Sequence, residues 1–563
     1  MNDDITGHRI AMLPGAGADT LTGPVVQAGF DDLYTAVYAV LGDAKTDHDL
    51  IKLYKGSHGS PDPHPVVTEL GQFFYRERRG LFGYACHQAN PSGLPTLADL
   101  DVFDAEQRPR VATRHVFDLL CRALTRPGEG AVDVLRHLVS RTHTLGSYRG
   151  GSSGFDEEAR AFAAAHFASV GVPATPDEVL VFCGGAKGAF TAFCAAIMCR
   201  RRHDDLHHLG GLLLTPAGYY QSLRLIPPLF GGTIHVTPEF TGTAVSDWLA
   251  ATAHHPRRCV YVPLVNNADG AVLTEPRAHA VAAAILQHNA THPGRPVYAL
   301  ADDVYTGSYL DPERPGVPIA AITGTDLGHP EWGQMSDWTL SVVTPSKTFA
   351  LPTARVAFAT TTNPALRTAT AHYRTVLSHG RVPQAAELTA AAAICWTPQP
   401  WIDGWNTHYR TRLAHVTRRL DQINTQLGYR AVWADPIQGG WYLPLRLTPR
   451  LLPGAASSLD AFAALLHYGE GDPATGIALL PGELFGHRTA RPHGHELHGT
   501  GPAPFLLRGT LATSDRDLHR FSTRLAQAAT AWSGPDGPTL IKQALRRARR
   551  VADLDTILNT ARY

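Results

Sequence analysis

The segment SVVTPSKTFALPTAR, residues 341–355, places Lys347 directly after a short apolar run and Arg355 eight residues further along. The apolar run has the composition of a buried strand. Burying an ammonium group is expensive, so a lysine at the end of such a strand is unusual. Lysine is also the side chain that forms Schiff bases when desolvation lowers its pKa. The segment therefore predicts a buried strand with a reactive amine at its carboxyl end.

Seven short apolar runs, including this one, are interspersed with helical stretches such as residues 277–289. Most of the runs are apolar on both faces, a pattern typical of strands covered on both sides in a mostly parallel sheet. The sequence therefore predicts an α/β fold with a seven-stranded, mostly parallel sheet, whose ligands bind beyond the carboxyl ends of the strands. The predicted strands are residues 179–183, 211–215, 233–237, 259–264, 297–301, 338–343 and 355–361.

A glycine-rich turn follows the first of these strands and leads into an apolar helical stretch. The turn contains Gly185, Ala186 and Lys187. Backbone N–H groups at the start of a helix bind phosphate, because they point at the anion and the helix dipole favours negative charge. The turn has neither the GxxxxGK[ST] pattern of a P-loop nor the GxGxxG of a Rossmann fold. By itself, it is equally consistent with a phosphate site and with a tight structural turn.

Polar and aromatic residues follow the other strands and complete a set of chemical groups. They provide an aromatic ring, an amide–phenol pair, a carboxylate, a lysine, hydroxyl groups and an arginine. A phosphorylated pyridine aldehyde needs this set: the carboxylate keeps the ring nitrogen protonated, the lysine forms an imine, and the arginine holds the phosphate together with hydroxyl and N–H groups. The candidates are Tyr219, Asn267, Asp302, Tyr305, Thr344, Ser346, Lys347 and Arg355.

These motifs resemble those of the fold type I pyridoxal-phosphate (PLP) enzymes, the aspartate aminotransferase superfamily of class I and II aminotransferases. The similarity covers roughly residues 51–517. SKTFALP at residues 346–352 looks like the family's lysine motif, and DDVY at residues 302–305 is similar to its Asp-Glu-x-Tyr. NNADG at residues 266–270 occupies the place of Asn-Pro-Thr-Gly, with Ala-Asp in place of Pro-Thr. The resemblance implies a fold type I PLP-dependent transferase, with a large PLP-binding domain and a smaller α+β domain.

The resemblance also implies a chemistry. Lys347 would hold PLP as an internal aldimine and take the α-proton of an amino acid as general base. Asp302 would stabilise the resulting quinonoid, and Tyr219 would stack on the cofactor ring. Arg508 would bind the substrate α-carboxylate in a bidentate grip.

Two further candidates are implied in the N-terminal part of the chain. Gly59 belongs to a segment that looks like the family's substrate-loop motif, Gly-x-Pro-Asp. Tyr148 stands where the family has the tyrosine that reaches the cofactor phosphate of the neighbouring subunit. The expected assembly is therefore a homodimer or a higher homo-oligomer.

The chain divides into five regions on this interpretation. The N-terminal region is rich in aspartate, and the C-terminal tail contains the basic stretch KQALRRARR. The regions are an acidic leader or arm at residues 1–50, the N-terminal part of the small domain with an insertion at 51–147, the large PLP-binding domain at 148–375, the C-terminal part of the small domain at 376–535, and a helical tail at 536–563.

Composition excludes several classes of protein. The 563 residues include 50 Lys+Arg and 50 Asp+Glu, so no net charge would attract nucleic acid or an anionic membrane. The apolar runs are too short to span a bilayer, and the start of the chain does not resemble a signal peptide. The seven cysteines are odd in number and contain no CxxC, which predicts neither a metal site nor a disulfide framework and favours the cytoplasm.

Several functions remain open at this point. An aminotransferase is the first choice, because transamination is the commonest outcome in the family. The altered motif at residues 266–270 and the long segment 63–147 also suggest a lyase or a carbon–carbon bond-forming enzyme of specialised biosynthesis. Such an enzyme could perform γ-elimination or condensation on S-adenosylmethionine, possibly with a pyridine nucleotide. An aspartate β-decarboxylase-like enzyme shares the DDVY motif, and a PLP-binding transcription regulator is disfavoured by the acidic N-terminal region.

Overall fold

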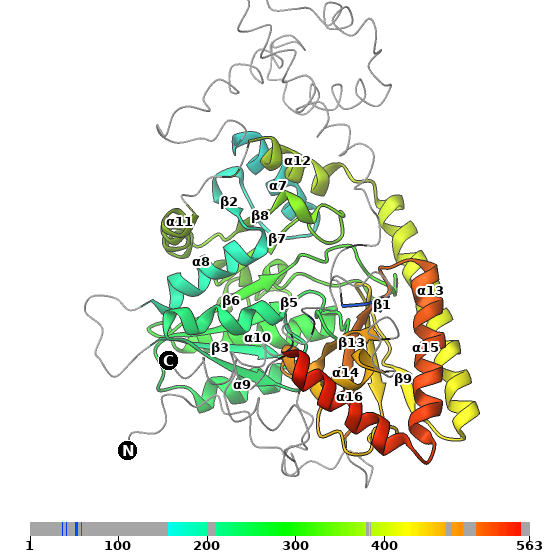
Figure 1. Cartoon of the computed structure of the whole chain (residues 1–563). Coiled ribbons are helices and arrows are strands. Elements are labelled where there is room, and N and C mark those ends of the chain that lie inside the picture. The colour runs from blue at the N-terminus through cyan, green and yellow to red at the C-terminus, as the bar shows by residue number, and fades with distance from the viewer. Residues whose placement is uncertain are drawn as a thin grey trace, which may run out of the picture.

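The computed structural model of the protein contains a seven-stranded sheet and a four-stranded sheet, each covered by helices (Figure 1). Helices lie on both faces of the larger sheet, whereas the smaller sheet is flanked by the C-terminal helices. The structure describes residues 37, 41, 51–54, 58, 156–199, 210–378, 382, 384–468, 476–487 and 503–552.

The large sheet contains the seven strands that the sequence predicts, and every observed bound lies within one residue of the predicted one. The strands are β2 (Val179–Cys183), β3 (Leu212–Pro216), β4 (Thr233–Thr237), β5 (Arg258–Pro263), β6 (Val297–Asp302), β7 (Thr339–Val343) and β8 (Val356–Thr360). Their order is β2-β8-β7-β6-β5-β3-β4. β8 runs antiparallel to both of its neighbours, and all other neighbours are parallel. The α/β prediction with a mostly parallel sheet is therefore confirmed.

Alternate residues of the strands face opposite helical layers, which explains why the strands are apolar throughout. On β5, Val260 and Val262 pack with α9 and α10, whereas Cys259 and Tyr261 pack with α8. α11 lies on the same face as α8, and α7 and α12 cover the other face at the β2 end. The helices are α7 (Asp156–Ser169), α8 (Ala186–Met198), α9 (Gly242–Ala251), α10 (Glu275–Thr291), α11 (Pro364–Ser378) and α12 (Gln384–Trp396).

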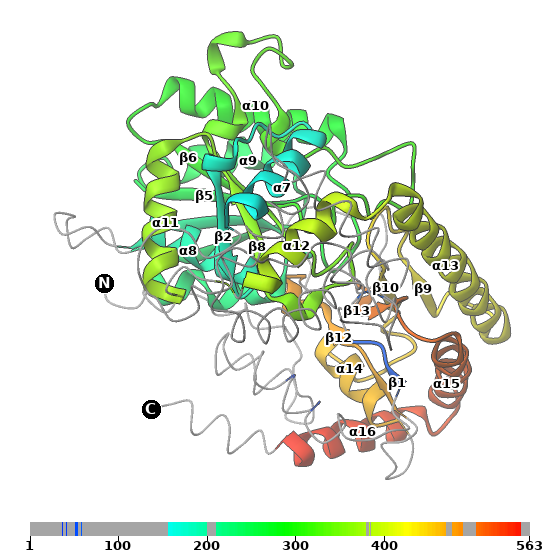
Figure 2. The ribbon, with the colours of Figure 1, turned by 90° about the horizontal axis from the view of Figure 1, so that it is seen from above.

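The smaller sheet is antiparallel, with the strand order β12-β13-β10-β9. Its helices are seen beside it in Figure 2. The strands are β9 (Val432–Ala434), β10 (Tyr442–Leu447), β12 (Leu480–Pro481) and β13 (Phe505–Thr510). The helices are α13 (Gln399–Leu427), α14 (Ser458–Leu466), α15 (Asp515–Ser533) and α16 (Gly537–Ala552).

Short 3-10 helices form many of the connections. They are Pro176–Glu178, Gln221–Leu225, Pro227–Phe230, Ile319–Ala321, Pro330–Trp332, Met335–Asp337, Pro352–Ala354 and Gly482–Phe485. The segment Gly482–Phe485 connects β12 to the candidate site described below, and Pro352–Ala354 precedes β8.

The described N-terminal residues belong to the smaller unit. β1 (Ile51–Lys52) pairs in parallel with β11 (Ile477–Ala478). Val37, Leu41 and Leu53 are fully buried in the same apolar cluster as the small sheet. The N-terminal part of the chain therefore contributes a short strand and buried side chains to a unit whose other described strands come from the last third of the chain.

The predicted boundary between the two units, at residue 375, falls inside α11. The next helix, α12, packs against α7 and shares a buried cluster with β2 and β8. Its alanine run, Ala390–Ala393, is fully buried there. By its packing, α12 lies with the large sheet, and α13 is the first helix that packs on the small one.

Candidate active site

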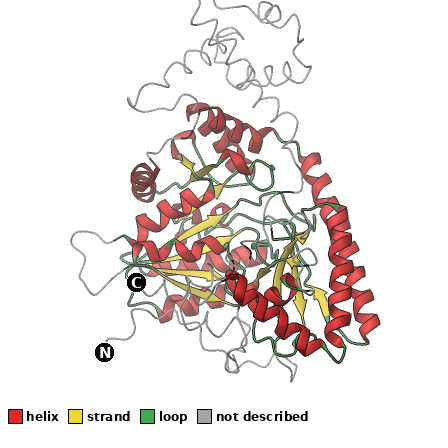
Figure 3. Ribbon diagram, viewed as in Figure 1, coloured by secondary structure: helices red, strands yellow, loops and turns green. Residues whose placement is uncertain are grey.

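The candidate site lies where the carboxyl ends of neighbouring parallel strands meet the small sheet. Asp302 is the last residue of β6, and Lys347 follows β7 by four residues. Asn267 follows β5 by the same interval. Arg508 comes from β13 of the small sheet and contacts Asn267. Figure 3 shows the two groups of strands side by side, with loops between them.

The Lys347 amine lies close to two phenol groups. Its Nζ donates to the Tyr442 Oη at 3.4 Å and lies 5.8 Å from the centre of the Tyr305 ring. The two phenol oxygens of Tyr305 and Tyr442 are 2.9 Å apart, and Asn267 Nδ2 donates to the Tyr305 oxygen at 3.3 Å. The structure thus brings together the predicted lysine and the predicted amide–phenol pair, and adds a second phenol.

Arg508 is buried and fixed in orientation. Its Nη1 donates to Asn267 Oδ1 at 2.7 Å, and its Nη2 donates to the backbone carbonyl of Tyr54 at 2.8 Å. The guanidinium carbon lies over two aromatic rings, 4.3 Å from the centre of Tyr442 and 4.8 Å from that of Phe485. The Nε is buried and has no hydrogen-bond partner among the described residues. A donor therefore remains for an incoming carboxylate.

Asp302 is buried at the edge of the sheet. The hydroxyl of Tyr261, on the neighbouring strand β5, donates to its Oδ2. Burial raises the pKa of Asp302 to about 6, although the Tyr261 hydrogen bond and the charge of Lys347 oppose the shift. Asp302 Oδ1 is buried and has no partner among the described residues. An unpaired buried acceptor suits a ligand that carries an N–H group.

The predicted phosphate turn is held in an unusual backbone conformation. Gly185 has φ +71°, and Arg355 adopts a left-handed φ of 54°. The Gly185 N–H donates to the Arg355 carbonyl at 2.9 Å, and Arg355 Nη2 donates to the Gly184 carbonyl at 2.6 Å. A Cβ at Gly185 would lie 3.5 Å from Arg355 Nη2. At that distance a Cβ would make an ordinary contact, so the positive φ is what favours glycine here, and the Arg355 guanidinium lies close to Gly185, directly before α8, whose first residues are Ala186 and Lys187.

The hydroxyl groups of the lysine loop are close to each other. Thr344 Oγ1 lies 2.9 Å from Ser346 Oγ and donates to the carbonyl of Val356 at 2.6 Å. This second bond ties the loop after β7 to β8, which begins next to Arg355. Thr344 and Ser346 are therefore close together, and their loop is joined to the strand that begins next to Arg355; the phosphate site that these three residues would form stays a prediction.

For three predicted residues, the structure does not test the predicted role. Tyr219 is 1% exposed, and burial raises its pKa to about 12. Its ring packs against Gly486, where an added Cβ would lie 2.6 Å from Tyr219 Cε1. Its stacking on a cofactor ring remains a prediction. Gly59 and Tyr148 lie outside the described residues, so their roles remain predictions as well.

Tyr261 and Tyr442 are functional candidates that the sequence interpretation did not single out. Tyr261 was included in a predicted buried strand, and Tyr442 follows the residues Gly439, Gly440 and Trp441 in the sequence. A signal existed in both cases, because a buried tyrosine hydroxyl needs a hydrogen-bond partner. Sequence alone did not indicate which polar groups those partners would be.

A sequence model described as aminotransferase class I and II matches residues 137–443, which is more than half of the chain. The chain belongs to the class I and II aminotransferase family. The enzyme is therefore PLP-dependent, as the motifs around Lys347 predicted. Among curated proteins, no sequence matches this chain significantly.

Solved structures show the same fold. The aspartate aminotransferase from Rhizobium meliloti is 20% identical, with 71% of this chain and 88% of that chain covered at a TM-score of 0.51. A mutant of Thermus thermophilus aspartate aminotransferase is 17% identical, with 88% and 96% covered at a TM-score of 0.54. The aromatic aminotransferase from Pyrococcus horikoshii is 19% identical, with 71% and 92% covered at a TM-score of 0.51. At these identities the likeness concerns the fold alone.

The residues of the site fit PLP. The buried Asp302 Oδ1, which has no partner among the described residues, could accept a hydrogen bond from a protonated ring nitrogen, and the glycine turn with Arg355 could hold a phosphate. Lys347 stands close enough to Asp302 for its charge to stabilise the carboxylate. These three anchors match the two polar ends and the aldehyde of the cofactor.

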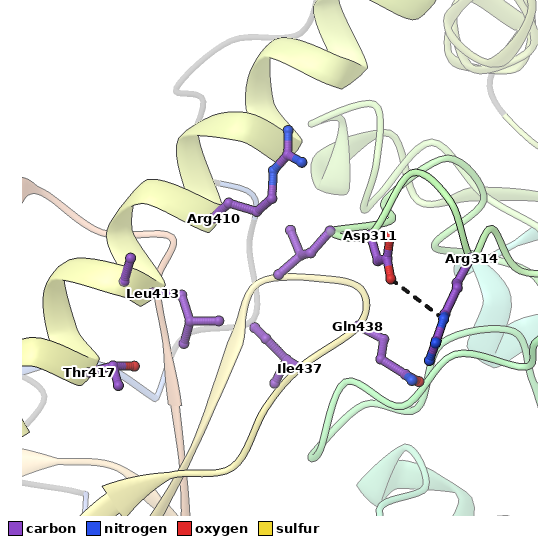
Figure 4. A pocket seen from close by; sticks show the side chains of 9 residues that line it. Asp311, Arg314, Arg410, Leu413, Thr417, Ile437 and Gln438 are labelled. Atoms are coloured by element: carbon purple, nitrogen blue, oxygen red, sulfur yellow. Dashed lines mark ion pairs between the residues drawn. The ribbon is translucent and has the colours of Figure 1, made fainter.

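A pocket of about 640 Å³ lies apart from this site, between α13 and the loop that carries Asp311 and Arg314 (Figure 4). None of the candidate site residues lines it. The lining residues are Leu310, Asp311, Arg314, Arg410, Leu413, Ala414, Thr417, Ile437 and Gln438.

Within the described ranges, no group of three or more His, Cys, Asp or Glu side chains could hold a metal ion. No helix there combines the length and apolar character needed to cross a membrane.

Proposed function

We propose that this enzyme is an aminotransferase that moves the amino group of a small α-amino acid to a 2-oxo acid. The main support is the grouping of a lysine amine, a buried carboxylate and a buried arginine at one junction between two sheets. Lys347 and Asp302 come from the large sheet, and Arg508 comes from the small one. Family membership favours the same chemistry.

Residues of the large sheet would hold the cofactor. Asp302 would pair with the ring nitrogen, and Asn267 and Tyr305 would contact the ring hydroxyl. The turn at Gly185 and the Arg355 guanidinium would bind the phosphate, joined by the hydroxyls of Thr344 and Ser346. When bound, PLP supplies an electron-withdrawing ring that accepts the electron pair released when a bond at the substrate α-carbon breaks.

Arg508 would bind and orient the substrate. Two of its nitrogens are already fixed by Asn267 and by the Tyr54 carbonyl, and two aromatic rings restrain the guanidinium plane. A carboxylate that binds this rigid group loses little further freedom, so the α-carbon is held in one orientation. Arg508 thereby determines which bond at that carbon is presented for reaction.

Lys347 would take the proton from the α-carbon. Its Nζ is held at the phenol oxygen of Tyr442 and over the Tyr305 ring, which keeps the amine at one place in the site. A base fixed within reach of the proton accelerates its transfer by about 10²–10⁴-fold. Tyr261 keeps Asp302 in place, because its hydroxyl occupies one carboxylate oxygen and leaves the other for the cofactor.

The assembly and location are proposed on separate grounds. A homodimer is proposed because Tyr148 occupies the position of the family's residue that reaches the neighbouring cofactor. A cytoplasmic location is proposed because the odd number of cysteines, without CxxC, suits a reducing compartment. Light scattering of the purified protein tests the first of these proposals.

Product analysis tests the proposed reaction. Purified holoenzyme is incubated with amino acids and 2-oxo acids, and products are identified by mass spectrometry. Formation of a new amino acid that depends on the 2-oxo acid supports transamination. Methylthioadenosine released from S-adenosylmethionine without an amino acceptor would instead indicate a lyase or a condensing enzyme. Carbon dioxide released from aspartate would indicate a β-decarboxylase.

A further inference from the structure

Tyr442 occupies a central position in the site without being one of the residues expected to hold cofactor or substrate. It is the first residue of β10 and is 1% exposed. Its phenol oxygen receives the Lys347 Nζ–H at 3.4 Å and lies 2.9 Å from the Tyr305 oxygen. Its ring carries the Arg508 guanidinium on one face. Tyr442 therefore touches both a reacting nitrogen and the arginine proposed to bind the substrate.

The charges around Tyr442 favour its deprotonated form. Burial by itself raises the pKa of Tyr442, but the positive charges of Lys347 and Arg508 and the hydrogen bonds from Tyr305 and Lys347 outweigh it and lower the pKa from its usual value. Among the described residues, the groups that shift the pKa of this phenol are the two cations, from the loop after β7 and from β13, and the Tyr305 hydroxyl from the loop after β6. Asp302 acts on Tyr305 rather than on Tyr442.

Tyr305 behaves in the opposite way. Burial, the neighbouring Tyr442 and the charge of Asp302 all raise its pKa. Tyr305 therefore keeps its proton and donates it toward Tyr442, while its own oxygen accepts from Asn267. The Tyr442 oxygen is left as the common acceptor of two donors, Tyr305 O–H and Lys347 N–H. This is the environment of a proton-accepting oxygen.

We propose that Tyr442 is a catalytic residue that exchanges a proton with the Lys347 amine. In the forward direction a proton passes from the Nζ ammonium to the Tyr442 phenolate and gives a neutral amine and a neutral phenol. The return step restores the ion pair. One N–H bond breaks and one O–H bond forms, so no co-reactant is needed. The inference rests on the proposed function, since it concerns the amine that the aminotransferase reaction uses.

The exchange meets a requirement of amino acid chemistry. Lysine must be neutral before its nitrogen can attack a carbonyl or accept a proton from carbon. An incoming amino acid arrives as an ammonium ion and must also lose a proton. Tyr442 is placed to accept such a proton, because its ring lies against the arginine that would hold the substrate carboxylate. A phenylalanine would fill the same volume but could not accept it.

An ultraviolet titration of the full-length protein tests the proposal. Tyrosinate absorbance is followed from neutral to alkaline pH in the wild type, in Tyr442→Phe and in Tyr298→Phe, all after cofactor removal. We expect one tyrosine of the wild type to ionise at lower pH than the others, because the pKa of Tyr442 is lowered. This step should disappear in Tyr442→Phe and persist in Tyr298→Phe, a control at the far end of β6 from Asp302. No early step in the wild type, or an early step that survives in Tyr442→Phe, overturns the proposal.

A second variant keeps the test decisive if Tyr442→Phe folds poorly. Lys347→Met removes the ammonium while leaving the phenol in place. The early step should move upward by at least one pH unit, about a tenfold change in the ionisation constant. An unmoved step would show that the two groups do not share a proton and would overturn the proposal. Because neither titration requires turnover, failure of the proposed aminotransferase activity would be recognised separately.

Steady-state kinetics of the holoenzyme distinguish proton transfer from packing. Tyr442→Phe should lower kcat by at least about tenfold while changing KM by less than about threefold, and the alkaline side of the kcat profile should move. An unchanged kcat with a raised KM would mean that Tyr442 only supports Arg508, and would overturn the proposal.

Discussion

Tyr261 and Tyr442, on different sheets, each lie diagonally across from a charged residue on the neighbouring strand. The charge is negative beside Tyr261 and positive beside Tyr442. On the large sheet, Tyr261 pairs in register with Leu300, so Asp302, two residues on, is its diagonal neighbour on the same face. On the small sheet, Pro444 pairs with Arg508, so Tyr442 is the diagonal neighbour of Arg508.

The sign of the neighbouring charge separates the two tyrosines. Burial and the carboxylate of Asp302 raise the pKa of Tyr261 well above its usual value, so this phenol keeps its proton and donates it. The cations beside Tyr442 lower the pKa of its phenol, so it accepts protons instead. The same side chain thus serves as a fixed donor on one sheet and as an acceptor on the other.

The largest expected effect comes from removing the lysine that the second tyrosine contacts. Lys347→Ala should abolish the yellow chromophore that borohydride fixes to the protein, because the amine that binds the cofactor aldehyde is gone. kcat should fall by more than about 10²-fold, the lower end of what a positioned base contributes. Mass spectrometry of the reduced protein locates the label. A label retained by the variant at another lysine would show that the site is assigned to the wrong residue.

Replacing the charged partner on the small sheet should have the next largest effect. Arg508→Lys retains the positive charge but loses the fork of donors and the contact with two rings. We expect kcat/KM to fall about 10–100-fold, from the loss of about 1.5–3 kcal/mol of charge-assisted hydrogen bonding. The cofactor should remain bound, as its absorption will show. Weaker cofactor binding with unaltered kcat/KM would show that Arg508 holds the cofactor and does not bind the substrate.

The large sheet allowed more of the site to be predicted than the small sheet did. Parallel strands present their carboxyl ends at one edge, so residues that follow them must converge, and Lys347, Asp302 and Asn267 were identified on that basis. Their strands were predicted to within one residue because both faces are apolar. The observed contact between Asn267 and Arg508 was not implied by any strand, since it joins two sheets.

The two tyrosines were missed for a physical reason. An apolar run accommodates a tyrosine as a core ring, and the direction of its hydroxyl depends on the strand that pairs beside it. Tyr261 meets Asp302 only because β5 lies next to β6 in one register, and Tyr442 meets Arg508 only because β10 pairs with β13. Pairing partners and register are properties of the folded sheet that a single sequence does not specify.

Acidic pH should weaken cofactor binding through the large-sheet carboxylate. The pKa of Asp302 is raised to about 6 mainly by burial, so the carboxylate is charged at pH 7 and becomes protonated as pH falls through about 6. The neutral acid no longer pairs with a protonated ring nitrogen. PLP affinity, measured by fluorescence titration of the cofactor-free protein, should therefore fall below pH 6. Asp302→Asn should bind more weakly at pH 7 and lack this decline; a decline that persists in Asp302→Asn would assign it to another group.

Tyr261→Phe should have the smallest effect on PLP binding, but it tests the comparison between Tyr261 and Tyr442 most directly. The Tyr261 hydrogen bond lowers the pKa of Asp302, so its removal should shift the acid decline in PLP affinity to higher pH. The hydrogen bond from Tyr261 to the Asp302 carboxylate is worth about 1.5–3 kcal/mol at most. Because water can replace part of this bond in the variant, PLP affinity at pH 7 should fall no more than about tenfold. Tyr298→Phe, on the adjacent strand, should leave the profile unchanged. A different outcome would reverse the donor and acceptor roles of the two tyrosines. In that case Tyr261→Phe would remove the tyrosine that ionises first in the ultraviolet titration, and Tyr442→Phe would shift the decline of PLP affinity at acidic pH.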